Sequence, residues 1–360
     1  SFRALFQHQP NEEMKSRPKK TTIYQVAKRA GVAISTVSRV LNDSPNVSDE
    51  TKEKVSRAIR ELRFRPQASA RMLATRQPQM LAIAVPSFTT PFYNEILKGI
   101  KDEMQQYDLD IMIYNTGSVE PEKAVNNFFD RGTADAVIIL SIEMTDTLHQ
   151  QIEGSGIPTV LIGEQHPSYS FIDLDDYKGG YLAGEHLVRQ GYRRPGMILP
   201  VVSSAASENR RKGFIDALVA NGVKPKGEYF ITGRNVKHAG FTEEAGFEAA
   251  QKIIEMRNEG LMMPDSVFCA NDTQAVGAIF GFTQAGMRIP EDIALMGYDN
   301  IKLTRYLDLT TVDQAMYKAG EEATQQLMKQ LNDPDAPIAQ RIIAPELIAR
   351  SSTRSVGHGD

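Results

Sequence analysis

Tryptophan is absent from this 360-residue chain and cysteine occurs once, at Cys269, so no internal disulfide bond can form. Chains without disulfides are typical of a reducing cytoplasm. No apolar run approaches the roughly 20 residues that a membrane-spanning helix needs. The polar, proline-containing residues 1–20 lack the apolar segment of a secretory signal peptide. We therefore expect a cytoplasmic protein whose first 20 residues form a disordered arm.

Sequence signatures of common enzyme classes are missing as well. The chain has no G-x-G-x-x-G after a first strand, no G-x-x-x-x-G-K loop followed by Ser or Thr, and no H-E-x-x-H. Its six histidines do not have the spacing of metal ligands. The acidic pair Asp175 and Asp176 is better explained as a loop between two lobes than as a catalytic dyad. These absences predict a protein that is not an enzyme and uses no cofactor and no metal ion.

Charge is distributed unevenly along the chain. The whole sequence carries −4, but residues 15–76 contain 15 Lys and Arg against 5 Asp and Glu, a net charge of +10 that leaves −14 for the rest. A small basic region on an acidic body is expected when one end of a protein meets phosphates. Neutralising phosphates releases condensed counterions and supplies much of the non-specific affinity for DNA. A solvated basic surface without a partner is the alternative.

The segment Ile23–Asn42 (IYQVAKRAGVAISTVSRVLN) has the pattern of two short helices joined by a turn at Gly31, which is typical of a helix-turn-helix. Apolar residues recur on the inner faces of both helices, namely Ile23, Val26, Ala27, Ala30, Val37, Val40 and Leu41. Ile34, Ser35 and Arg39 lie on the outer face of the second helix. There they suit a thymine methyl contact, a hydrogen bond and a bidentate guanine contact in the major groove. A helical hairpin packed inside a larger domain is the alternative.

A third helix is predicted after Ser48, whose hydroxyl suits an N-cap and is followed by acidic residues in the first turn. Apolar residues then recur at helical spacing up to Pro66, which closes a three-helix domain over residues 21–66; they are Val55, Ile59 and Leu62.

Residues 67–78 separate this domain from the remainder of the chain. Their weakly amphipathic stretch is too short for a stable isolated helix. We expect a linker that folds only when it is held against a partner. The apolar Leu73 within this basic segment suits a wedge between base steps in a minor groove.

From residue 79 onward, apolar runs that suit buried strands alternate with helical patterns. The runs are residues 81–85, 111–114, 136–140, 159–163, 197–200, 229–232, 266–270 and 293–297. Helical patterns between them include residues 93–107, 178–190 and 210–221. This alternation predicts an α/β fold with parallel sheets covered on both faces. Eight strands with a central acidic stretch, IDLDDYKGG, indicate two similar lobes, and ligands of such folds bind where the strands end.

Polar residues follow several of these strands or open the helices that come next. Arg210 is expected to open a helix, Asn271 follows one strand, and Asp299 follows another. Arginine can hold hydroxyls or a carboxylate with its planar fork, and Asp and Asn bind polyol hydroxyls. The alternatives are structural, because Asn271 suits a helix N-cap and Asp299 suits a turn.

The helix-turn-helix, the VSDETKEKV stretch and the RPQASARMLA hinge resemble the DNA-binding head of the lactose-repressor family of bacterial regulators. The resemblance runs from about residue 19 to residue 354. It implies a hinge that folds on operator binding and DNA contacts from Thr22, Tyr24, Ile34, Ser35, Thr36, Ser38, Arg39, Asn42, Ala70 and Leu73. Two positions depart from the family pattern: Ala33 stands where a serine usually caps the recognition helix, and Gln67 replaces the usual asparagine.

The body resembles the effector-binding core of the same family, through the motifs ANDTQAVGA, MGYDN and LTTVDQ. The resemblance implies a two-lobed core over residues 79–354, similar to periplasmic sugar-binding proteins, and a tail over residues 355–360. It also implies effector contacts from Phe92, Tyr93, Arg210, Phe241, Asn271, Asp299 and Gln314. Gly163 stands where relatives often carry an acid. His238, in an apparent insertion beside the pocket, either reaches the ligand or is solvated, and solvation is favoured.

These features predict a transcriptional repressor that binds a pseudo-palindromic operator as a homodimer and responds to a small molecule, most simply a sugar or sugar derivative. A purine- or nucleoside-responsive regulator of the same family is the alternative. Two rivals come from other classes. A ligand receptor that has lost DNA function would show no DNA binding, and an α/β enzyme fused to a DNA-binding head would turn over its ligand.

Overall fold

The computed structural model describes residues 22–41, 44, 46–62, 64, 80–117 and 120–354. The chain divides into two compact units, residues 1–78, here called the head, and residues 79–360, here called the core. The predicted arm, hinge and tail lie outside the described residues. So do Pro66 and three predicted DNA contacts: Asn42, Ala70 and Leu73.

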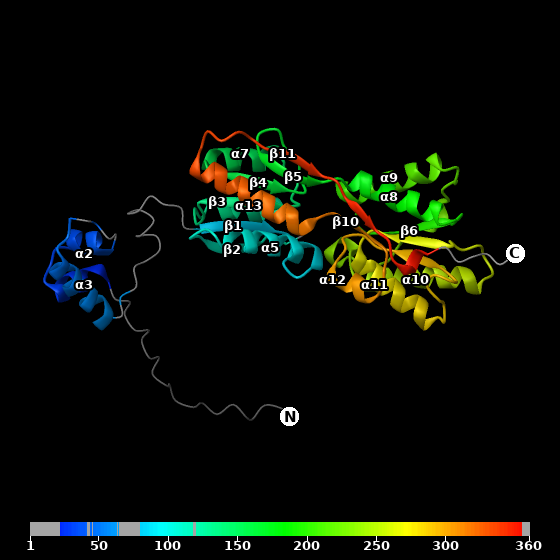
Figure 1. Ribbon diagram of the computed structural model, residues 1–360, viewed down its shortest axis with the longest axis horizontal. Coiled ribbons are helices and arrows are strands. Elements are labelled where there is room, and N and C mark those ends of the chain that lie inside the picture. The colour runs from blue at the N-terminus through cyan, green and yellow to red at the C-terminus, as the bar shows by residue number, and fades with distance from the viewer. Residues whose placement is uncertain are drawn as a thin grey trace, which may run out of the picture. The chain divides into compact units, whose positions relative to one another are not determined.

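The described part of the head consists of three helices, α1 (Ile23–Ala30), α2 (Ile34–Leu41) and α3 (Asp49–Glu61) (Figure 1). They pack around one small apolar cluster. Val26, Val37 and Val55, one from each helix, are fully buried against one another. Gly31 ends α1 in the left-handed region at φ 69°, where glycine has no steric penalty. An ion pair of 2.5 Å between Arg29 and Glu61 joins α1 to α3. The predicted helix-turn-helix is therefore present.

The first lobe of the core is built on a six-stranded parallel sheet in the order β11-β5-β4-β3-β1-β2. Its strands are β1 (Met80–Val85), β2 (Asp110–Asn115), β3 (Ala136–Leu140), β4 (Thr159–Ile162), β5 (Ser170–Leu174) and β11 (Gln340–Ile343). Its helices are α5 (Pro91–Met104), α6 (Pro121–Phe129), α7 (Asp146–Ser155) and α13 (Met316–Asn332). Helices cover both faces of the sheet, as expected for parallel strands (Figure 1).

The second lobe has a four-stranded parallel sheet in the order β7-β6-β8-β9 and a small antiparallel pair, β10 with β12. The strands are β6 (Pro195–Leu199), β7 (Phe230–Thr232), β8 (Ser266–Cys269), β9 (Ala294–Met296), β10 (Thr311–Asp313) and β12 (Glu346–Ile348). The helices are α8 (Asp176–Arg189), α9 (Ala205–Ala220), α10 (Glu243–Asn258), α11 (Asp272–Gln284) and α12 (Lys302–Tyr306). Three 3-10 turns lie at Gly227–Tyr229, Lys237–Gly240 and Ser351–Thr353.

The chain crosses between the two lobes three times: after β5, after β10 and after β11 (Figure 1). All eight predicted strands are present, whereas β5, β10, β11 and β12 had no predicted counterpart. Among the described residues, no helix is long and apolar enough to span a membrane.

Two sequence-based expectations about local structure were wrong. Asp175 and Asp176 do not form a connecting loop: Asp175 caps α8 by accepting a hydrogen bond from the Lys178 amide at 2.9 Å, and Asp176 is the first residue of that helix. Arg210 does not open a helix either, because α9 begins at Ala205 after the N-cap Ser204. Serine and aspartate are strong N-caps, so each helix starts at the capping residue.

Candidate DNA-binding surface and effector site

The second helix of the head presents a polar, solvent-exposed face. Ile34 is 41% exposed, and Ser35 and Arg39 are also exposed, whereas Val37 between them is fully buried. Thr36 and Ser38 are half-buried. Because the buried valine anchors α2, the exposed side chains keep a fixed direction, as a helix that reads a major groove requires.

The first helix adds exposed residues beside this face. Thr22 precedes α1, and its backbone amide donates to Gln25 Oε1 at 2.8 Å. Tyr24, in the first turn, is 68% exposed. Ala33 precedes α2, and only its backbone carbonyl serves the helix start, accepting from the amides of Thr36 and Val37. The methyl side chain of Ala33 offers no acceptor, so that start lacks a side-chain cap.

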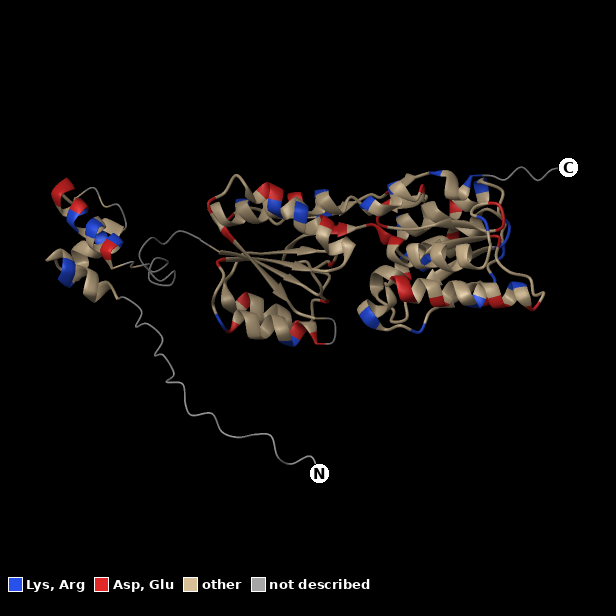
Figure 2. Cartoon of the chain, turned by 90° about the horizontal axis from the view of Figure 1, so that it is seen from below, with Lys and Arg blue, Asp and Glu red and all other residues tan. Residues whose placement is uncertain are grey.

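The described part of the head carries seven Lys and Arg and four Asp and Glu, so both colours appear on its helices in Figure 2. Its net charge of +3 is smaller than the +10 of residues 15–76. The difference comes from basic residues that lie outside the described part of the chain.

In the core, three contacts from the second lobe hold Arg210 in place. Its Nε donates to Asp176 Oδ1 at 2.6 Å, and its Nη1 donates to the carbonyl of Ala270 at 2.7 Å. Its guanidinium lies 3.9 Å from the centre of the Tyr298 ring. Arg210 is 6% exposed, so this is a buried, paired cation.

Asp299 lies beside this cluster, in the loop after β9. Its Oδ1 accepts a hydrogen bond from Gln314 Nε2 at 2.5 Å, and the residue is 3% exposed. Burial raises the pKa of Asp299 to about 7; the charge of Arg210 and the Gln314 hydrogen bond oppose the rise, and the charges of Asp176 and Asp313 add to it. Its backbone has φ 113°, an unusual value outside glycine.

The first lobe contributes Tyr93 from α5. Its hydroxyl forms a hydrogen bond with the side chain of Ser141, which follows β3, and the charge of Asp299 raises the pKa of this hydroxyl. Burial is the largest effect on this hydroxyl and raises the pKa of Tyr93 to about 12. Phe92 packs edge-on against Tyr93, with ring centres 4.9 Å apart. The residues around Asp299 therefore come from both lobes.

The remaining predicted contacts occupy structural positions nearby. Asn271 is buried and caps α11, its side chain accepting from the Gln274 amide at 2.9 Å. Phe241 is partly buried against the apolar core of the second lobe. His238 is half-buried in the 3-10 turn before Phe241 and has a left-handed backbone at φ 48°.

Sequence reasoning missed Asp176 and Tyr298 as members of this cluster. Asp176 was assigned to a connecting loop. In the MGYDN motif, Asp299 was predicted as a contact and the preceding Tyr298 was not. Acids are common in the first turn of any helix, so the position of Asp176 after an N-cap gave no signal of a buried partner. Tyr298 donates its hydroxyl to Asp176 Oδ1 at 3.3 Å, so both residues fix the position of Arg210.

Comparison with known proteins identifies the family. Residues 22–67 match bacterial regulatory proteins of the lacI family, and residues 185–353 match a periplasmic binding protein-like domain. The chain is 32% identical over 342 residues to the HTH-type transcriptional repressor PurR of Mannheimia succiniciproducens, covering 93% of this chain and 99% of that relative. The chain belongs to the lacI family.

Solved structures of similar proteins agree with this assignment. The lac repressor dimer bound to operator and the anti-inducer ONPF is 27% identical with a TM-score of 0.73, over 93% of this chain and all of that one. A complex of the transcriptional regulator CelR with cellobiose is 26% identical with a TM-score of 0.65, over 92% of this chain and all of that one.

As a lacI-family member, the chain is a DNA-binding transcriptional repressor and not an enzyme. The predicted family, the predicted fold class and the exclusion of an enzyme are confirmed. Operator DNA and a small-molecule effector are the partners of this family. These comparisons do not identify the effector as a sugar, because the similar proteins include a repressor named PurR as well as the CelR complex with cellobiose.

Proposed function

We propose that this repressor reads the major groove of its operator with Ile34, Ser35 and Arg39 on α2, while Thr22, Tyr24, Thr36 and Ser38 contact the flanking backbone or bases. The single observation that carries the proposal is the orientation of α2, which buries Val37 completely and exposes Arg39. Asn42, Ala70 and Leu73 complete the proposed contacts from outside the described residues.

We further propose that the effector binds between the two lobes of the core. Arg210, Asn271, Asp299 and Gln314 would supply polar contacts, and Phe92, Tyr93 and Phe241 would supply ring surfaces. The proposal is supported by the effect of Asp299, in the second lobe, on Tyr93, in the first: the charge of Asp299 raises the pKa of the Tyr93 hydroxyl. A sugar or sugar derivative is the first candidate, and the CelR structure contains cellobiose. Purines and nucleosides are the second.

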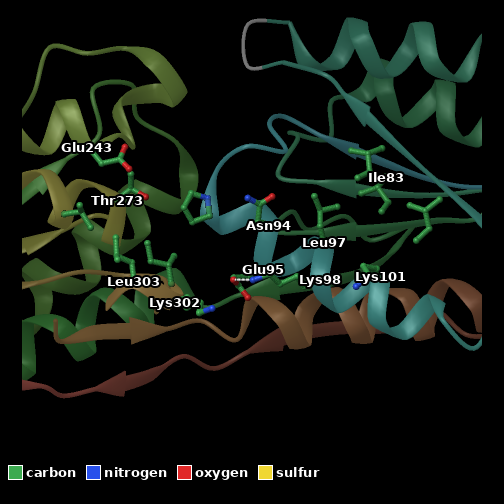
Figure 3. Close-up of a pocket in the computed structure, with 15 residues that line it drawn as sticks. Ile83, Asn94, Glu95, Leu97, Lys98, Lys101, Glu243, Thr273, Lys302 and Leu303 are labelled. Carbon is green, nitrogen blue, oxygen red and sulfur yellow. Dashed lines mark hydrogen bonds and ion pairs between the residues drawn. The ribbon is translucent and has the colours of Figure 1, made fainter. Parts of the chain in front are cut away.

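The protein is proposed to act in the cytoplasm as a homodimer, because a two-fold operator is matched by a two-fold protein. A cavity of about 610 Å³ on the core supports this assembly (Figure 3). Its lining includes the exposed edge-strand residues Ile111 and Ile113 from the first lobe and Val276 and Leu303 from the second. Phe280, on the same helix as Val276, is 56% exposed. A second copy would cover this apolar surface.

Effector binding between the lobes would change their spacing and hence the fit of two heads to two half-sites. Thermodynamic linkage requires the operator to change effector affinity by the same factor. A coupling of about 1–3 kcal/mol is enough for a 5- to 150-fold switch.

The proposal is tested by selecting operator sequences from a random DNA library with the full-length protein and then measuring operator affinity with and without candidate effectors. We expect a pseudo-palindromic sequence and at least one compound that changes its affinity. Selection of no sequence would overturn the DNA-reading surface. A selected operator that no compound affects would overturn the effector site alone.

A further inference from the structure

The base of the proposed effector site has more negative than positive charge. Arg210 is the only buried lysine or arginine among the residues that the structure describes, and it is already paired with Asp176 at 2.6 Å. Asp299 is a second buried carboxyl, near enough for the charge of the same guanidinium to lower its pKa. Two carboxyl groups therefore lie near one cation, and the positive charge of Arg210 is already paired before a ligand binds.

Other charged groups near Asp299 do not reverse this balance. Asp313, the last residue of β10, adds negative charge near Asp299, and Asp272, the first residue of α11, is a further buried carboxyl whose pKa is raised by burial and by the charge of Asp299. Arg350 opposes Asp272, but its guanidinium is used by the Leu309 carbonyl and by Asn300 Oδ1, the latter at 3.0 Å. The hydroxyl of Tyr93 is neutral at physiological pH, because burial raises its pKa to about 12.

A hydrogen-bond acceptor in this site has no donor. The Gln314 side chain is 1% exposed and gives its Nε2 proton to Asp299, while its Oε1 is buried without a hydrogen-bond partner. A buried acceptor without a donor is destabilising, so a ligand that supplies the donor gains affinity. The unpaired Oε1 belongs to the amide that contacts the Asp299 carboxyl, so a ligand that contacts one of these oxygens is placed to contact the other.

We infer that the effector is an uncharged or positively charged compound that donates hydrogen bonds to Asp299 and to Gln314 Oε1, and that its phosphorylated or carboxylated analogues are excluded. Vicinal hydroxyls of a free sugar or adjacent N–H groups of a heterocycle meet this requirement. A phosphate group would add charge of the same sign as Asp176 and Asp299 and would bring acceptors where the site lacks donors. The inference rests on the proposed effector site.

Acidic residues on the first lobe extend the same charge preference. Glu143 follows β3, Glu164 follows β4 and Asp173 lies in β5. Burial raises the pKa of Glu164, and the charges of Asp173 and Glu143 raise it further, so both of these acids lie near Glu164. An anion that approached from this side would also meet negative charge.

The experiment compares matched pairs of compounds on the full-length protein by isothermal titration calorimetry at pH 7.5. The pairs are glucose with glucose 6-phosphate, ribose with ribose 5-phosphate, cellobiose with cellobionate, and guanosine with guanosine monophosphate. We expect the uncharged member of at least one pair to bind, and its charged analogue to bind at least about 30-fold more weakly, since like charges a few ångströms apart repel one another in a buried site. Operator affinity is measured in parallel.

Two variants separate charge from shape. Asp299→Asn removes one negative charge. It should therefore reduce the ratio of the affinities of the uncharged and charged members of the responding pair at least about threefold. Asp308→Asn removes the same charge from an exposed position and should leave the ratio unchanged. A charged analogue that binds as tightly as its parent, with an intact operator response, would overturn the inference and leave the proposed function standing. No binding by any compound, with no operator response, would count against the effector site itself.

Discussion

Arg210 on α9 donates its Nε proton to Asp176 at the start of α8, 34 residues earlier in the chain, across 2.6 Å. Both side chains are almost completely buried, with 7% and 12% exposure. The tight packing of α8 against α9 makes this contact possible, because Gly180 places its Cα against the backbone of Arg210. The guanidinium is therefore oriented by the fold before any effector binds, which lowers the entropy cost of binding.

Arg210→Ala should remove the effector response and also destabilise the core by about 3–5 kcal/mol, because it leaves Asp176 as an unpaired buried charge. Urea denaturation of the full-length protein measures the stability loss, and operator titration at low temperature tests whether DNA binding survives. Arg211→Ala, at the exposed neighbouring position, serves as the control and should change neither. An Arg210→Ala protein with wild-type stability would show that the ion pair is not formed in solution.

The pH dependence of stability should show the raised pKa of Asp299. The folded pKa of about 7 exceeds the ordinary value of 3.8, so the folded state holds this proton more tightly than the unfolded chain does. The free energy of unfolding should then fall as pH rises from about 4 to about 7, and level off above 7. Urea titrations at pH 5, 6, 7 and 8 measure this slope. Asp176 and Asp272 have pKa values raised by burial and act in the same direction, so Asp299→Asn should reduce the slope without abolishing it.

Binding of a ligand that donates to the Asp299 carboxylate should have the opposite dependence. The ligand needs the deprotonated form, so its affinity should rise as pH passes through about 7 and reach a plateau above that. Calorimetry in two buffers of different ionisation enthalpy would detect the released proton. An affinity that does not change between pH 6 and pH 8 would contradict a direct contact with Asp299.

Strand positions in this protein follow from local sequence, whereas the shortest strands do not. β1 and β3 are short continuous apolar runs, as buried parallel strands usually are. β10 and β12 have three residues each and pair with one another from distant parts of the chain. Their sequences carry no period, because the three-residue pairing is fixed by the lobe crossovers and not by local propensity.

The proposed effector site shows the same division. Asp299 and Asn271 were predicted as contacts because each follows an apolar strand, where α/β folds place ligands, and that role stays a prediction. The pairing of Arg210 with Asp176 was not predictable, because it depends on how closely α8 and α9 approach. That approach requires glycines facing backbone atoms across a helix interface, which a single sequence does not distinguish from glycines in turns.

Arg39→Ala in the head should abolish sequence selectivity while leaving weak, salt-sensitive DNA binding. Arg39 is exposed on α2, so its removal costs little stability but loses a base contact worth about 1–3 kcal/mol per half-site. Competition between the selected operator and random DNA, at two salt concentrations, measures the ratio of specific to non-specific affinity. Arg305→Ala, an exposed arginine of the core, is the matched control. Retained selectivity would mean that α2 does not read the bases.

Two helical glycines should respond in opposite directions to substitution by alanine. A Cβ on Gly180 would lie 1.9 Å from the backbone oxygen of Arg210, so Gly180→Ala must push α8 away from α9. A Cβ on Gly154, within α7, would meet nothing within 4 Å. We expect Gly154→Ala to stabilise the protein by about 0.5–1 kcal/mol through helix propensity. Gly180→Ala should destabilise it by several times that amount, as overpacking does. Urea denaturation of both variants tests the pair.

Dimer formation should depend on the apolar surface that lines the cavity in Figure 3. Ile113 is 47% exposed on the edge strand β2 and Leu303 is 45% exposed on α12, and both residues line the cavity. An aspartate at either position would bury a charge in the proposed interface, so Ile113→Asp and Leu303→Asp should shift the protein toward monomers.

Sedimentation velocity at micromolar concentration measures the shift, and Val219→Asp provides the control, since Val219 is 60% exposed on α9 and does not line this cavity. Monomeric variants should also lose operator affinity, although the sequence of the head is unaltered. Each head would then bind its half-site without a second head linked to it. Dimers that persist in both variants would place the homodimer contact on another face of the core. Monomers that keep full operator affinity would instead show that a single head is sufficient for recognition.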